Sequence, residues 1–377
     1  MKKQIIAAAV AVAVAAPAMA QVSISGRVGA TYDNFKNAPI NGRGQNQASI
    51  GDNNTRVIFG ITEDLGGGLK FAGQIDIRGN TDVGATTTAN TSGNTFASVT
   101  GGWGRVLVGS HDMLYNEVLG FGTSGDVLDG VNIHRRTLFT SNRDNTGGAA
   151  PTQITGTRVN NLLRYDSPTF GGGFNFTLGY STNPAAAELP SNTEATDRDD
   201  DGSASMVFAR YASGPLKATL GYYNEKRDAV TGAPAAAKPS DKFTLAAVSY
   251  VVGPLEIGLN MTTAAYKSGV DGARTQTRDN FSIPVNYSMG STTLHAGYTE
   301  VGSNNRSRNT GAAQWMVGAT HFLSKRTLLG AGYSALSNGN NARYQMLGTV
   351  PADTAGGMIG AAGGDATYYG FGIRHNF

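Results

Sequence analysis

The sequence contains no cysteine, which excludes disulfide bonds, thiolate metal sites and cysteine nucleophiles. Beyond residue 20 it has no apolar run near the roughly 18 residues that a membrane-spanning helix needs. Its 30 lysines and arginines nearly balance its 27 acidic residues and are spread along the chain, so no basic region suited to nucleic acid stands out. Helical membrane proteins, disulfide-stapled domains and nucleic-acid binders are therefore disfavoured.

Catalytic motifs are equally scarce. The five histidines show no metal-ligand spacing, and no G-x-S-x-G or Walker sequence occurs. His111 and His134, which have acids nearby, are the one arrangement that could imitate a barrel hydrolase. We therefore expect no enzyme and no cofactor.

One acidic segment resembles a metal site. Residues 197–202 (DRDDDG) match the first half of a calcium-binding loop, in which the ligands would be Asp197, Asp199 and Asp201. Phe208 stands where such a loop needs a bidentate glutamate. A solvated acidic loop without bound metal is therefore the favoured interpretation.

The first twenty residues carry an export signal. Lys2 and Lys3 precede an apolar stretch at 5–16, and residues 18–20 (AMA) form an A-x-A cleavage site. Loss of the two lysines lowers the formal charge from +3 to +1. We expect a cleaved signal peptide at 1–20 and one domain at 21–377.

The remaining chain alternates apolar and polar residues, with abundant glycine. This period of two is the signal of a β-strand whose two faces have different surroundings. In the first such segment, Val22, Ile24 and Val28 share one face, and Arg27 lies on the other. Sixteen segments follow the pattern: 22–34, 55–62, 69–78, 95–101, 105–110, 159–166, 174–181, 204–212, 216–224, 243–251, 255–266, 279–288, 292–300, 314–322, 327–335 and 367–377.

The connections between these strands alternate between tight turns and longer polar loops. The longer ones lie near 35–53, 79–94, 111–157, 182–203, 225–241, 267–278, 301–312 and 336–366. All turns then lie at one end of the structure and all loops at the other, which is the layout of an outer-membrane barrel. A soluble β-sandwich is the alternative, but its strands are shorter and its connections do not alternate so regularly. The fold predicted is all-β: a 16-stranded antiparallel transmembrane β-barrel.

The third long loop is the most unusual segment. Nearly fifty residues without sustained periodicity are rare in a compact domain unless they are functional or disordered. This loop holds many apolar residues, such as Met113, Leu119 and Phe121, which need burial. We expect it to fold into the lumen, pack against the inner wall and set the width of a channel. Its candidate acids are Asp112, Glu117, Asp126 and Asp129.

Four segments resemble the trimeric general porins of beta-proteobacteria: 63–70 (EDLGGGLK), 161–168 (NLLRYDSP), 323–327 (LSKRT) and 370–377 (GFGIRHNF). The resemblance covers essentially the whole chain after residue 20. It implies sixteen strands, a homotrimer, passive diffusion of small hydrophilic solutes and a third loop bent into the pore. The terminal Phe377, with apolar residues at alternate positions before it, is similar to the signal read by the barrel insertion machinery.

The inward face of the predicted strands is rich in basic residues: Arg27, Arg56, Lys70, Arg78, Arg105, Arg158, Arg164 and Arg210. Inward acids such as Asp33 and Asp76 are fewer. In the resembled family, basic wall residues oppose carboxylates of the third loop. The resemblance therefore implies a constriction between Arg27, Arg56 and Arg78 on the wall and the four loop acids.

The function expected is a water-filled outer-membrane channel for passive diffusion of ions and small hydrophilic solutes. Two alternatives stay open on the same barrel, a channel that prefers an anion or a sugar and an adhesin that acts through its loops. Expected partners are solutes, outer-membrane lipid and lipopolysaccharide, the insertion machinery and two further copies of the chain. The turns and termini would lie in the periplasm and the loops outside the cell.

Overall fold

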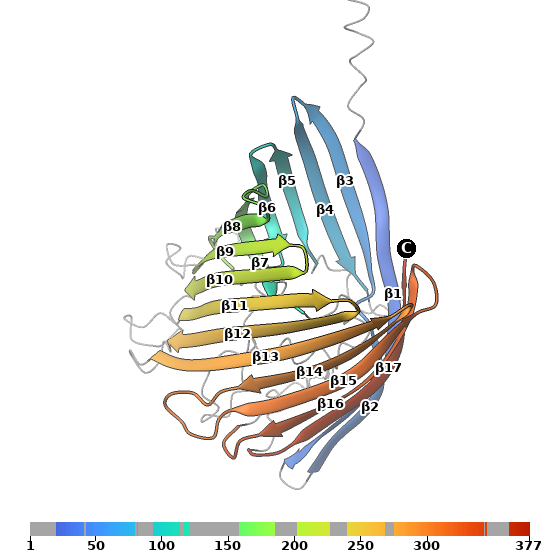
Figure 1. The fold of residues 1–377 in the computed structure, drawn as a ribbon, viewed down its shortest axis with the longest axis vertical. Coiled ribbons are helices and arrows are strands. Elements are labelled where there is room, and N and C mark those ends of the chain that lie inside the picture. The colour runs from blue at the N-terminus through green and yellow to red at the C-terminus, as the bar shows by residue number, and fades with distance from the viewer. Residues whose placement is uncertain are drawn as a thin grey trace, which may run out of the picture.

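The computed structural model describes residues 20–40, 43–79, 81, 93–113, 117–120, 158–184, 202–226, 240–267, 275–342, 344 and 362–377. These residues form a single sheet of β-strands (Figure 1). The strands are β1 Gln21–Ile40, β2 Arg43–Asp52, β3 Arg56–Gly66, β4 Leu69–Arg78, β5 Thr95–Gly101, β6 Gly104–His111, β7 Val159–Asp166, β8 Phe174–Ser181, β9 Ser203–Ser213, β10 Leu216–Lys226, β11 Ser240–Val252, β12 Leu255–Lys267, β13 Thr275–Met289, β14 Thr292–Val301, β15 Ala312–Phe322, β16 Thr327–Asn338 and β17 Ala366–Asn376. Within the described ranges, no helix is long and apolar enough to cross a membrane.

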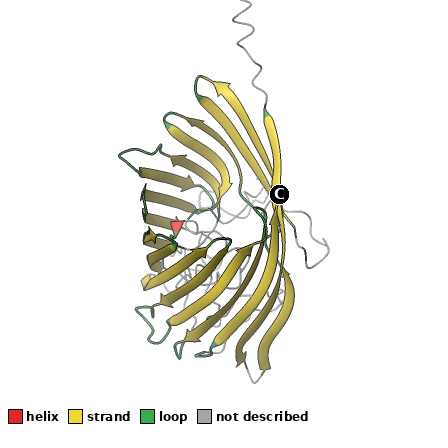
Figure 2. Cartoon of the chain, turned by 45° about the vertical axis from the view of Figure 1, so that its right-hand side comes forward, coloured by secondary structure: helices red, strands yellow, loops and turns green. Residues whose placement is uncertain are grey.

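The sheet closes on itself. Apart from β2 and β3, which do not pair with each other, consecutive strands pair antiparallel. β1 also pairs with β17, from Arg27 opposite Asn376 to Asn37 opposite Ala366. The seventeen strands make a wall of sixteen, because β2 and β3 both pair with β1 and are two halves of one interrupted strand. Figures 1 and 2 show the strands curving around one axis. The predicted sixteen-stranded antiparallel barrel is confirmed.

The first long connection was predicted wrongly. The sequence pattern indicated a loop at 35–53, whereas β1 continues to Ile40 and β2 occupies Arg43–Asp52. These extensions (FKNAPI and RGQNQASIGD) are mostly polar, and their few apolar residues, such as the buried Phe35 and the exposed Ile50, do not alternate regularly with polar ones. A strand that continues beyond the apolar part of a membrane meets water on both sides, so the contrast on which the period-2 signal depends disappears.

The two faces of the wall differ as the alternation predicted. Outward-facing apolar residues are strongly exposed, for example 63% for Leu220 and 58% for Phe371. Inward-facing polar residues are buried, for example Thr219 and Ser334. Outward aromatics also pack across strands, and the rings of Tyr32 and Phe371 stack at 5.3 Å. A closed sheet pairs its backbone groups internally, so an apolar exterior of this kind suits lipid.

Strand lengths vary around the wall. β1 has 20 residues, whereas β5 has 7 and β6, β7 and β8 have 8 each. A tilted strand needs about nine to eleven residues to span the hydrocarbon core of a bilayer. The wall is therefore low on the side of β5–β8.

Candidate functional site

Three arginines form one row on the inner wall. Arg27 on β1 lies opposite Arg56 on β3, and Arg56 lies opposite Arg78 on β4. The side chains of Arg56 and Arg78 are 13% and 21% exposed. Like charges directly opposite each other in a sheet are destabilising. The row therefore depends on acceptors placed between its members.

Asp76 and Asn54 supply these acceptors. The Oδ2 atom of Asp76, whose side chain is 2% exposed, accepts from Arg56 Nη1 at 3.3 Å and from Arg78 Nη2 at 3.1 Å. The backbone carbonyl of Asn54 accepts from the Nε atoms of Arg27 and Arg56 at 3.1 and 3.2 Å. The Asn54 Oδ1 atom accepts from Arg56 Nη2 and Arg78 Nη1, each at 3.4 Å. Among the residues that the structure describes, this group thus brings together three positive charges and one negative charge, a formal surplus of two.

A second group lies where the third loop leaves β6 and returns to β7. The Asp112 carboxylate lies 3.3 Å from Arg158 Nη2 and accepts from Asn94 Nδ2 at 3.1 Å. Asn94 Oδ1 in turn accepts from the Asp112 backbone N–H at 3.0 Å and from Arg158 Nε at 3.3 Å. The positive charge of Arg158 lies close enough to repel that of Arg78. The second group therefore continues the arginine row.

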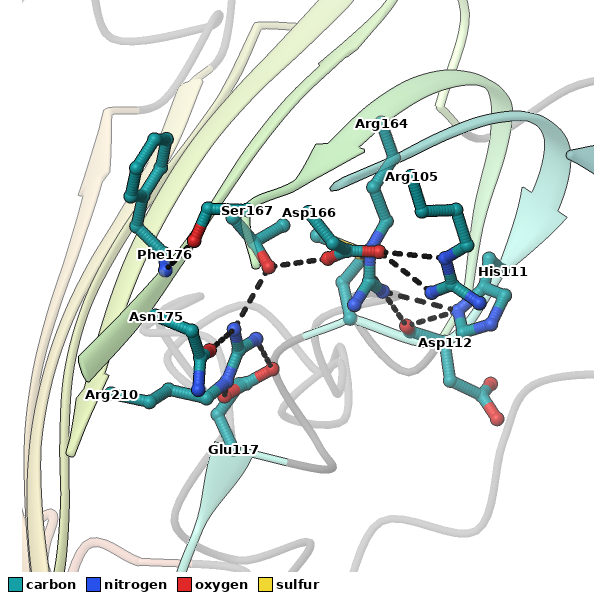
Figure 3. A network of polar contacts seen from close by, with 12 residues as sticks. Arg105, His111, Asp112, Glu117, Arg164, Asp166, Ser167, Asn175, Phe176 and Arg210 are labelled. Carbon is teal, nitrogen blue, oxygen red and sulfur yellow. Dashed lines mark hydrogen bonds and ion pairs between the residues drawn. The ribbon is translucent and has the colours of Figure 1, made fainter. Parts of the chain in front are cut away.

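Asp166 on β7 connects the next part of the wall (Figure 3). Its Oδ2 atom accepts two bonds from Arg105, at 3.0 and 2.6 Å, and its Oδ1 atom accepts from Arg164 Nε at 2.8 Å. Oδ1 also accepts from the Thr177 hydroxyl at 2.6 Å, and that hydroxyl accepts from Arg210 Nη1 at 2.8 Å. One carboxylate thus orients two arginines directly and a third through a hydroxyl.

Glu117 from the third loop completes the network. Its carboxylate binds Arg210 with both oxygens, through Nη2 and through Nε at 2.6 Å. Such forked pairing fixes geometry as well as charge. Glu117 therefore lies against β9. Its partner among the described residues is Arg210 rather than one of the early-strand arginines Arg27, Arg56 and Arg78.

The third loop enters the barrel interior at its described residues 117–120. Asn260 on the inner face of β12 accepts from the Leu119 N–H at 2.8 Å and donates to the Leu119 carbonyl at 2.9 Å. Asn286 on β13 donates to the Gly120 carbonyl at 2.6 Å. A Cβ atom on Gly258 would lie 2.8 Å from the Leu119 carbonyl oxygen, so glycine leaves room for the loop backbone. The loop has therefore crossed from β6 to the wall at β12 and β13.

Apolar packing accompanies these bonds, as the sequence indicated. Met113 and Val118 belong to a buried cluster with inner-face residues of β7 and β9–β12, and Leu119 packs against it. The inward-facing aromatics Phe208 and Tyr223 are part of this cluster, at 0% and 1% exposure.

The structure places some predicted site residues together and leaves others undescribed. Arg27, Arg56 and Arg78 form one row, whereas Asp112 and Glu117 pair with Arg158 and Arg210. The remaining candidates, Asp126, Asp129, Asp197, Asp199 and Asp201, lie outside the described residues, as does His134. In the part of the chain that the structure describes, no group of three potential ligands could hold a metal ion.

Sequence reasoning missed three members of the network. Asp166 shares the inward face of Arg164 by its spacing of two, so the alternation contained a usable signal for it. Asn94 and Asn54 lie in connections between strands, where no periodicity fixes the direction of a side chain. Only the folded chain shows their contacts.

The linked groups have an excess of positive charge. Counted over the described residues, seven arginines meet four carboxylates, a formal surplus of three. The arginines are Arg27, Arg56, Arg78, Arg105, Arg158, Arg164 and Arg210, and the carboxylates are those of Asp76, Asp112, Glu117 and Asp166. Further around the described inner wall both signs are buried, with Arg278 and Arg374 positive and Glu225 and Asp241 negative. The excess is therefore concentrated between β1 and β9.

A model of a protein family described as Gram-negative porin matches residues 7–341 of this chain. The outer membrane porin protein 32 of Delftia acidovorans is 29% identical over 386 aligned residues, which cover 100% of both chains. Among solved structures, the anion-selective porin from Comamonas acidovorans superposes with a TM-score of 0.71 at 21% identity, covering 95% of this chain and 100% of that one. The trimer form of OmpT from Vibrio cholerae gives 0.66 at 14% identity, covering 95% and 99%. The first two of these relatives are named porins, and the third is named an outer membrane protein.

Proposed function

Because this chain belongs to the Gram-negative porins, we propose that its channel favours anions through the arginine row on β1, β3 and β4. The protein is an outer-membrane porin, and its barrel forms a water-filled channel for passive diffusion of ions and small hydrophilic solutes. The proposal concerns the selectivity of that channel and the residues that determine it.

The observation that carries the proposal is the charge of the row. Arg56 and Arg78 share the Asp76 carboxylate, and Arg27 joins them through the Asn54 carbonyl. Counted over the described residues, the linked groups up to β9 hold three more positive than negative charges. Charges that line a narrow aqueous path raise the local concentration of the opposite ion. A structural neighbour carries the name anion-selective porin, which agrees with this direction.

The third loop supplies the opposite side of the constriction. We assign the wall role to Arg27, Arg56 and Arg78 and the loop role to Asp112 and Glu117, with Asp126 and Asp129 as further loop candidates. Asp112 and Glu117 each pair with an arginine, so they neutralise Arg158 and Arg210 rather than the row. The field across the lumen then favours anions near β1–β4.

We infer that the chain assembles as a homotrimer, and the uneven wall supports this. Strands β5–β8, with 7 or 8 residues each, are shorter than the roughly nine to eleven that a lipid-facing strand needs. Contact with further copies of the chain would cover this low side. The OmpT structure in trimer form offers a precedent on the same fold.

Export and orientation complete the proposal. Residues 1–20 would be removed as a signal peptide, the tight turns would face the periplasm, and the long loops would face outward, toward lipopolysaccharide. Phe377, which exchanges two backbone hydrogen bonds with Gly26 at 3.1 Å each, would be read by the insertion machinery.

The deciding test is the reversal potential of the purified protein in planar bilayers under a potassium chloride gradient. We expect a reversal potential with the sign of a channel that is more permeable to chloride than to potassium. We also expect a conductance that rises linearly with salt concentration. A potential of the sign set by potassium would contradict the anion preference. A conductance that saturates with one solute would indicate a dedicated binding site instead.

A further inference from the structure

The second strand of the barrel is interrupted beside the arginine row. Ala30 on β1 pairs with Asp52 and Arg27 pairs with Arg56, so two residues of β1 face three residues, 53–55, of the other strand. One extra residue in a strand is a β-bulge, which shifts the alternation and re-aims the side chains that follow. The bulge therefore puts Arg56 on the inner face in line with Arg27.

The bulge has a defined geometry. Asn54 has a φ of +58°, in the left-handed region that asparagine tolerates better than most residues. Its neighbour Thr55 receives a bond from the Gly29 N–H at its hydroxyl, at 3.2 Å, and its own N–H donates to Asp52 Oδ2 at 3.0 Å. The Asn53 N–H donates to the Gly29 carbonyl at 3.1 Å. These bonds hold Asn54 in place on both sides.

Asn54 then supplies acceptors to three arginines at once. Its carbonyl oxygen takes the Nε–H groups of Arg27 and Arg56, and its Oδ1 atom takes one N–H group each from Arg56 and Arg78. Long arginine side chains lose considerable rotamer freedom when they are ordered, and three neighbouring guanidinium groups repel one another. A fixed acceptor between them offsets both effects.

We propose that Asn54 is a positioning residue that sets the selectivity of the channel, because it orders the three arginines without cancelling their charge. The inference rests on the anion preference proposed above. A carboxylate at this point would order the arginines equally well but would remove half of the formal surplus of two in the row. The neutral amide of Asn54 provides acceptors and leaves the positive charge of the row unchanged.

Two substitutions separate order from charge. Asn54→Asp keeps the side-chain acceptor and tolerates the positive φ, but adds a negative charge. Asn54→Gly keeps the positive φ and the backbone carbonyl, but removes Oδ1 without changing any charge. Asn161→Gly is the matched control. Asn161, on β7, also has a positive φ, of 48°, and donates to the Asn183 carbonyl beyond the end of β8, not to the row.

The measurements are the chloride-over-potassium permeability ratio and the open-channel current noise at low salt. We expect Asn54→Asp to lower the permeability ratio about two- to fourfold, which is the effect of one added charge about 10 Å from the permeating ions in a water-like medium. Its current noise should equal that of the wild type, because the side-chain acceptor is kept. Asn54→Gly should raise the noise, because Arg56 and Arg78 lose an acceptor, and should lower the ratio by less than the aspartate does. The Asn161→Gly control should match the wild type in both.

Distinct outcomes overturn distinct claims. If the wild type does not favour chloride, the anion preference fails, whatever the variants do. If the wild type favours chloride and Asn54→Gly matches it in ratio and noise, the positioning role of Asn54 is refuted and only the charge of the row matters. Heat resistance and far-UV circular dichroism equal to those of the wild type establish that each variant has folded.

Discussion

Neutralising Arg56 and Arg78 together should shift the ion preference toward cations. The change Arg56→Gln with Arg78→Gln removes two of the three positive charges of the row. The charges of Arg27 and Asp76 remain, so the formal charge counted over these described residues falls from +2 to zero. Anions lose attraction and cations lose repulsion. Both effects move the reversal potential in the same direction.

The size of the shift follows from distance and screening. A unit charge about 10 Å from an ion in a water-like medium contributes about 0.4 kcal/mol. Removing two charges, each of which acts oppositely on chloride and potassium, therefore changes the free-energy difference between the two ions in the pore by about 1.6 kcal/mol. Without screening this corresponds to a change of about fifteenfold in the permeability ratio. At 0.1 M salt the Debye length is about 10 Å, which reduces the expected change to about threefold, and at 1 M it should nearly vanish.

A third substitution guards against misfolding. Asp76 is 2% exposed, and a buried carboxylate stripped of its partners costs about 3–5 kcal/mol. Adding Asp76→Asn removes this penalty and leaves a net charge of +1, so the triple variant should show half the free-energy shift of the double variant. A larger shift in the triple variant would refute an origin in charge.

The assay is the reversal potential in planar bilayers at several salt concentrations. The matched control is Lys325→Gln with Arg326→Gln, which removes two positive charges from the exposed turn between β15 and β16. This control should leave the potential unchanged. An equal shift in the control, or no shift in the double variant at low salt, would show that the row does not determine selectivity.

Three further predictions concern the loop and the closing strand. Asn260→Ala removes both hydrogen bonds to Leu119 and should raise single-channel conductance and current noise. The control Ser282→Ala, on the neighbouring strand β13, should change neither. Glu117→Gln should loosen the loop by about 1.5–3 kcal/mol, the usual value of a charged hydrogen bond, and proteolysis of the folded barrel should detect this. Deleting Phe377 should lower the amount of folded protein in the outer membrane more than it lowers refolding in detergent, and equal losses would argue against recognition by insertion machinery.

The sequence predicted the wall well because lipid and water impose opposite demands on the two faces of each strand. The same contrast placed Arg27, Arg56 and Arg78 on the inner face. It could not predict β2, where apolar residues are too few to alternate regularly with polar ones. Nor could it predict that Glu117 pairs with Arg210, since this contact depends on the path of a loop without periodicity.

The contacts of Asn54 show the limit most clearly. Its importance comes from a left-handed backbone conformation and from three arginines that converge from three strands. Residues 53–55 (NNT) resemble any polar turn in the sequence. A one-residue bulge is smaller than the error of any strand boundary read from alternation, so its partners are visible only in the structure.

The pairing of β1 with β17 has a consequence for how the chain reaches its membrane. β1 is synthesised first, yet eleven of its residues gain their second neighbour only when the last strand arrives. Until then its open edge can pair with any extended segment nearby, including that of another unfinished copy. Substitutions that weaken the β1–β17 seam should therefore reduce the yield of assembled barrels through aggregation during transit, while every channel that does assemble conducts normally.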